Sequence, residues 1–196
     1  MKESVIEASL AEAGLIFMGM VAISDPLIPP DLATRASSCF SEELTLAESV
    51  YLDDPLLLEK ANREWYRMSR EGGLFGEGER KFLVAVNCAD GDSPQIWWWA
   101  KAELSDPWDI MGAGAASGAL GAAHSYPGFV MLSLDGDVIV RGDRGEVSID
   151  LTVVREPHRL PIFLRHGEWL AAWPDTDEFT RAALKRWLEK ARSREL

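Results

Sequence analysis

The strongest constraint on this chain is a change in the spacing of its apolar residues at Lys81. From this point apolar residues alternate with less apolar ones, beginning with Phe82, Val84 and Val86. A period of two is typical of β-strands, whose successive side chains point to opposite faces of a sheet. Further runs of this kind lie at residues 96–104, 129–134, 138–141 and 146–154.

Short turn signals join these runs. Asp90-Gly91 and Asp135-Gly136 each separate two runs, and Arg141-Gly142-Asp143 is expected to form another turn. Connections this short cannot hold a crossover helix, so the sheet should be antiparallel. In the last run we expect one set of side chains to face inward, namely Val147, Ile149, Leu151 and Val153.

Helical signals lie on either side of the strand region. Ser4 and Glu7 form a capping box for a first helix that ends near Gly14. A second helix should begin with Asp54 as N-cap and Pro55 in its first position, and end at residues 72–73, which are glycines. A last helix is expected at residues 175–193, with Asp175 as its cap and Glu178 three residues later.

These elements predict an α+β fold, an antiparallel sheet of five or six strands with flanking helices in a single compact domain covering residues 1–196. A chain of this length buries roughly 70% of its unfolded surface, enough for one core. We expect helices and one strand, at residues 15–23, in the N-terminal third (1–75), the sheet at 80–155 and the last helix at 175–193.

Negative charge dominates the sequence and is unevenly placed. The formal net charge is -12. Nine basic and seven acidic residues lie at positions 155–196, whereas residues 1–154 carry eleven basic and twenty-five acidic ones. Such a body repels phosphate backbones and anionic lipid, so nucleic-acid and membrane binding are not expected. A cationic protein is the partner that this charge favours, although acidity also serves solubility alone.

The cysteines and the apolar segment near the N-terminus bear on location. Cys39 and Cys88 lack CxxC spacing and are expected to be small buried side chains in a reducing compartment. The apolar run at residues 14–23 is too short to span a bilayer as a helix. It also follows an acidic rather than a basic segment, unlike a secretory signal. We therefore expect a cytoplasmic protein.

The most unusual feature is a run of three tryptophans at positions 97–99. In a strand, Trp98 would share the core face with Ala100, Ala102 and Leu104. The opposite face would present Trp97, Trp99, Lys101 and Glu103, a mixture of large aromatic rings and charges that is typical of a binding surface. The alternative is that a helix or loop covers the two rings.

A second candidate site lies around the Gly-Ala segment at residues 112–121. It lacks the spacing of a nucleotide-binding loop, and the sequence has no HExxH motif, so no cofactor or metal is expected. The segment is either a closely packed small-residue helix or a loop. A hydrolytic triad there would use His124, with Ser117 or Ser125 as nucleophile and Asp109 or Asp135 as the orienting carboxylate.

The sequence therefore favours a non-enzymatic, acidic interaction protein, for example an immunity-type inhibitor of a cationic toxin. A small hydrolase or transferase with a site near the Gly-Ala segment and His124 is the alternative. A homo-oligomer that uses the aromatic face as its own interface is a third reading.

Overall fold

The computed structural model describes residues 3–22, 27–88, 97–121 and 126–194. Within these residues one antiparallel sheet has seven strands in the order β1-β4-β3-β5-β6-β7-β2. This confirms the expected α+β fold with a single antiparallel sheet, although the strands number seven instead of five or six. The strands are β1 (Leu15–Met20), β2 (Thr45–Tyr51), β3 (Lys81–Asn87), β4 (Trp97–Leu104), β5 (Phe129–Leu132), β6 (Val138–Arg144) and β7 (Ser148–Arg155).

The additional strand is β2, which the sequence pattern did not indicate. It pairs with β7 over its whole length, from Thr45 opposite Val154 to Tyr51 opposite Ser148. It forms an edge of the sheet, and most of its side chains are at least partly exposed. Because one buried residue, Val50, is its only strong apolar anchor, its sequence shows no clear period of two.

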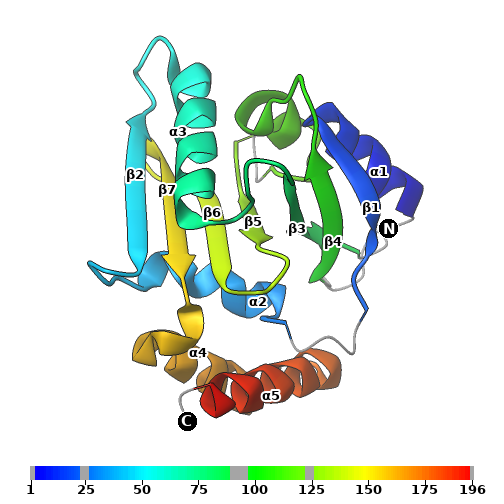
Figure 1. Cartoon of the computed structure of the whole chain (residues 1–196), viewed down its shortest axis with the longest axis vertical. Coiled ribbons are helices and arrows are strands. Elements are labelled where there is room, and N and C mark those ends of the chain that lie inside the picture. Colours follow the sequence, from blue (N-terminus) through cyan, green and yellow to red (C-terminus); the bar gives the residue numbers. More distant parts are fainter. Residues whose placement is uncertain (1–2, 23–26, 89–96, 122–125, 195–196) are drawn as a thin grey trace.

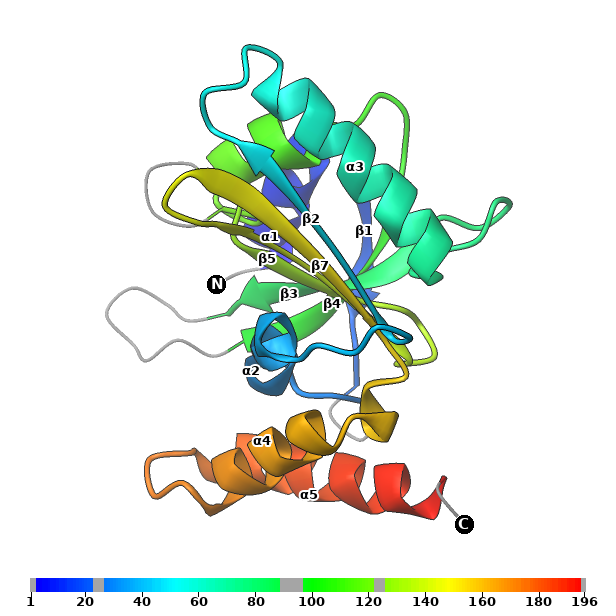
Figure 2. The same ribbon diagram turned by 90° about the vertical axis from the view of Figure 1, so that its left-hand side faces the viewer.

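Helices cover both faces of the sheet (Figures 1 and 2). On one face, α1 (Glu3–Glu12), α3 (Leu57–Gly72) and the short turn η2 (Ile110–Gly114) pack on the sheet. On the other lie α2 (Pro30–Ala33), η1 (Thr34–Ser38), α4 (Pro161–Ala172) and α5 (Glu178–Ser193). Each face thus has its own apolar core, and the central strands are apolar on both sides.

Two expectations about strand β7 and its neighbour are corrected by this arrangement. Val147 precedes β7 and is 63% exposed, whereas Ile149, Leu151 and Val153 do face a core. Arg141-Gly142-Asp143 is not a turn but lies inside β6, paired with residues of β5 and β7. The strand simply continues past the point where glycine and aspartate predicted its end.

The helix ends follow the sequence to within about two residues. The second helix, α3, begins at Leu57, so the prediction of Asp54 as its N-cap and Pro55 as its first residue is wrong; Asp54 instead accepts a hydrogen bond of 2.9 Å from the amide of Leu56 in the preceding turn. Gly73 ends α3 in the left-handed conformation, with φ of 88°, as the double glycine predicted. The cap of α5 is Asp177 instead of Asp175, and its carboxylate accepts a hydrogen bond of 2.9 Å from the amide of Thr180. Residues 161–172, for which no helix was predicted, form α4, with Pro161 in its first turn.

No helix in the described part of the chain is long and apolar enough to cross a membrane.

Candidate functional site

The three tryptophans of β4 line one pocket, but they differ in burial and in their contacts. Trp99 points into the core beneath α2, α4 and α5 and is only 5% exposed. Its indole Nε1 donates a hydrogen bond of 2.6 Å to the carbonyl oxygen of Ile28. The expectation that this ring faces an accessible surface is therefore wrong: the segment before α2 covers it.

Trp98 contacts α5 and the residue that follows β1, Val21. Its Nε1 donates a hydrogen bond of 3.0 Å to the carbonyl oxygen of Val21, and its ring stacks on Phe179 of α5 with centroids 4.7 Å apart. The ring is half-buried, while Ala100 and Ala102 farther along its face are fully buried as expected. Trp98 thus forms a wall between the sheet and the last helix.

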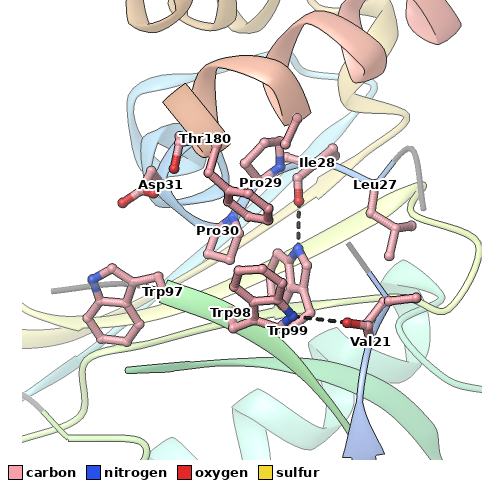
Figure 3. A pocket seen from close by; sticks show the side chains of 13 residues that line it. Val21, Leu27, Ile28, Pro29, Pro30, Asp31, Trp97, Trp98, Trp99 and Thr180 are labelled. Atoms are coloured by element: carbon pink, nitrogen blue, oxygen red, sulfur yellow. Dashed lines mark hydrogen bonds between the residues drawn. The ribbon is translucent and has the colours of Figure 1, made fainter. Parts of the chain in front are cut away.

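Trp97 is half-buried and lines a pocket of about 50 Å³ (Figure 3). We call this the tryptophan pocket. Its walls come from the start of β4, from the residues after β1, from the segment leading into α2 and from the first two turns of α5. Asp31 lies on the same side of the pocket as Trp97 (Figure 3). Thr180 lies next to Asp31 in this view. The pocket is therefore aromatic, with a carboxylate at one side.

The carboxylate of Asp31 is in an unfavourable environment for a negative charge. Burial raises its pKa above the ordinary value, and the nearby carboxylate of Asp177 raises it further. A backbone hydrogen bond and the guanidinium of Arg35 act in the opposite direction without cancelling these effects. Attraction between this carboxylate and a nearby cation would offset both effects.

The other two residues of the predicted binding face lie outside this pocket. Lys101 and Glu103 are half-buried farther along β4, and neither lines the pocket. Glu103 lies opposite Lys81 in the register of β3 and opposite Ile16 of β1. Of the predicted four-residue face, Trp97 and the buried Trp99 line the pocket, whereas Lys101 and Glu103 lie among charged and apolar neighbours.

Three residues of the pocket were not singled out in the sequence. Asp31 follows Pro29 and Pro30 in a segment that is typical of a turn. Aspartate is common in turns, so its presence there did not indicate a site. Phe179 lies within the predicted last helix, where an aromatic residue is expected to pack on the core, yet it is 38% exposed. Trp98 was assigned to the core. Only the tertiary structure brings these residues together.

Asp109, one of the carboxylates of the alternative catalytic site, has a structural role. It accepts hydrogen bonds of 2.8 Å from the amides of Gly112 and Ala113, and one of 2.7 Å from Asn62 Nδ2. Burial alone would raise its pKa, but these hydrogen bonds prevail, so the pKa lies below its ordinary value. The carboxylate caps η2 and joins it to α3.

The remaining residues of that site do not assemble around Asp109 in the described part of the chain. Ser117 donates its hydroxyl hydrogen to the carbonyl oxygen of Gly114. Asp135 lies in the β5–β6 turn, where it binds Ser133 and the amide of Asp137, near α5. His124 and Ser125 lie outside the described residues.

The Gly-Ala segment combines short helical turns with irregular backbone, and three of its four glycines leave no room for a Cβ. A Cβ at Gly121 would lie 2.0 Å from the carbonyl oxygen of Ala115, and one at Gly114 would lie 2.8 Å from the Cβ of Ala13. These contacts explain its composition through close packing against α1. Among the described residues, no three His, Cys, Asp or Glu side chains gather as metal ligands would.

Comparison of the chain with protein-family models, with curated proteins and with solved structures gave no match. The function must therefore be argued from the tryptophan pocket and the charge.

Proposed function

We propose that this protein is a non-enzymatic, acidic interaction protein of the immunity-inhibitor type, which binds a cationic protein partner through the tryptophan pocket. The observation that carries the proposal is that the carboxylate residue Asp31 and the indole of Trp97 line the same aromatic pocket. Aromatic faces attract cations, and a carboxylate in partly buried surroundings does so more strongly than one in water. A lysine or arginine side chain of the partner is the group that fits.

Two carboxylates from separate elements support a positive rather than a neutral ligand. Asp31 belongs to α2 and Asp177 caps α5, and the charge of Asp177 raises the pKa of Asp31. Mutual repulsion of this kind destabilises the empty pocket and is removed when a cation binds. A purely apolar ligand would leave both charges uncompensated and would desolvate Asp31 further.

The net charge of -12 acts at longer range in the same direction. A negative surface raises the rate at which a basic protein encounters it, while buried aromatic contacts slow dissociation. Fast association and slow dissociation are the properties that an inhibitor of a basic toxin needs.

The test uses fluorescein-labelled hexa-arginine as the probe and uncharged hexa-citrulline of similar shape as its control. Fluorescence anisotropy should show binding of hexa-arginine to the wild type and not of hexa-citrulline. Asp31→Asn and Trp97→Ala should each weaken binding by at least about tenfold, which corresponds to about 1.4 kcal/mol.

Matched variants separate the pocket from general acidity. Asp53→Asn removes the same charge at an exposed position outside the pocket, and Trp169→Ala removes an exposed indole from α4. Both should bind hexa-arginine within about twofold of the wild type. Equal losses in Asp31→Asn and Asp53→Asn would show that binding is diffuse and would overturn the proposal.

A further inference from the structure

A second hollow lies directly beyond Trp97 on the same face of the sheet. Its volume is about 210 Å³, and its walls come from β3, β5, β6 and the α2–η1 segment. Trp97 and Pro30 line both this hollow and the tryptophan pocket. The two spaces are therefore neighbours that share one indole and one proline as a common wall.

The floor of the second hollow is apolar. Ala85 and Val130 belong to the core on this face of the sheet and are at most 6% exposed. Phe129 also lines the hollow, but its ring belongs to the core on the opposite face, where a Cβ at Gly142 would lie 2.4 Å from it. A space with such a floor suits an apolar side chain.

Among the described residues that line this hollow, Arg141 is the one cationic side chain, and its charge is already neutralised. Its guanidinium binds the carboxylate of Asp143, the carbonyl oxygen of Thr34 and, at 2.8 Å, the hydroxyl of Ser37. Because an acidic partner and two further acceptors engage it, Arg141 holds η1 against β6 and shapes the wall. It does not make the hollow a site for anions.

We propose that the partner occupies both hollows with one extended segment, placing a cationic side chain in the tryptophan pocket and an apolar side chain in the second hollow. This inference rests on the proposed function and specifies the partner's recognised segment. In an extended chain alternate side chains point the same way, about 7 Å apart. Such a pair can lie on either side of the single indole of Trp97.

The experiment compares two peptides, acetyl-Gly-Arg-Gly-Leu-Gly-amide and acetyl-Gly-Arg-Gly-Ser-Gly-amide, by titration of the indole N–H resonances of the ¹⁵N-labelled protein. Both should shift the Trp97 resonance, which is assigned with Trp97→Phe. The leucine peptide should bind at least about tenfold more tightly, as expected for burial of one aliphatic side chain. Equal affinities would overturn the inference.

A filling variant locates the apolar subsite. Ala85→Leu places extra volume in the second hollow and should remove the advantage of the leucine peptide while the serine peptide binds as before. Ala172→Leu, the same change at an exposed position of α4, should keep the advantage. If Ala85→Leu is misfolded by circular dichroism, the comparison of the two peptides on the wild type still decides the matter.

The outcomes also distinguish the inference from the function on which it rests. If the serine peptide binds and Asp31→Asn abolishes that binding, the cation pocket stands whether or not leucine adds affinity. If neither peptide depends on Asp31, the proposed function fails, and the two-hollow segment fails with it.

Discussion

Asp31 shows how a single residue can be unfavourable for folding and useful for binding. Its pKa is raised mainly by burial and further by Asp177, so ionisation of Asp31 lowers the free energy of unfolding. For an acid whose folded pKa is raised, the favourable contribution to stability is present below its ordinary pKa and is lost as pH rises through the folded value. At neutral pH, ionised Asp31 therefore destabilises the empty protein.

Replacement of this carboxylate should separate stability from binding. Asp31→Asn is expected to raise Tm at pH 7 by about 2–4 °C, while the difference from the wild type should vanish near pH 3, where both side chains are uncharged. Differential scanning calorimetry at the two pH values measures this. A lower Tm for Asp31→Asn at pH 7 would contradict the strain that we assign to the empty pocket.

The same raised pKa predicts the pH dependence of binding. A cation is attracted to the ionised form, so affinity for hexa-arginine should fall as pH decreases through the raised pKa of Asp31. The fall should begin at a higher pH than an ordinary aspartate would give. Asp31→Asn should lack this step, which anisotropy titrations at a series of pH values would reveal.

At the scale of elements, the junction between α3 and η2 is organised by Asn62 and Asp109. Asn62 donates to Asp109 and accepts a hydrogen bond of 3.0 Å from the amide of Met111, so its amide group binds two residues at the start of the turn. Asp109 in turn satisfies two backbone amides that would otherwise be unpaired at the start of η2. The residue that the sequence offered as a catalytic carboxylate is thus a cap.

Loss of this cap should be visible as loss of stability. Asp109→Ala is expected to destabilise the fold by about 1–3 kcal/mol, because one capping interaction and the partner of Asn62 disappear together. Since the folded pKa of Asp109 is lowered, its contribution is present above the ordinary pKa and is lost as pH falls through the folded value. Urea unfolding at pH 7, with Asp53→Ala as the exposed control, measures it; equal stabilities would refute the role.

At the scale of the whole molecule, the charge and the pocket act at different ranges. The net charge of -12 is felt over the Debye length, about 10 Å at 0.1 M salt, whereas the pocket acts only on contact. The association rate should therefore depend on the whole surface, and the dissociation rate on the aromatic and carboxylate contacts.

Salt should therefore change one rate far more than the other. We expect the association rate constant for hexa-arginine, measured by stopped-flow anisotropy, to fall by about tenfold or more between 20 and 500 mM NaCl. The dissociation rate constant should change by less than about threefold, because the contacts in the pocket are partly shielded from solvent. A dissociation rate that rises as steeply as the association rate falls would argue against a pocket-held cation.

The sequence determined the antiparallel sheet, the long helices and their caps to within a few residues, because periodicity and capping are local properties of the chain. It did not reveal β2 or α4, whose own patterns are weak and whose stability depends on packing against β7 and α5. It identified the tryptophan run as unusual but not which ring would remain accessible. That was decided by the segment leading into α2, which covers Trp99. The same segment brings Asp31 into the pocket that Trp97 lines, although the two residues are far apart in sequence.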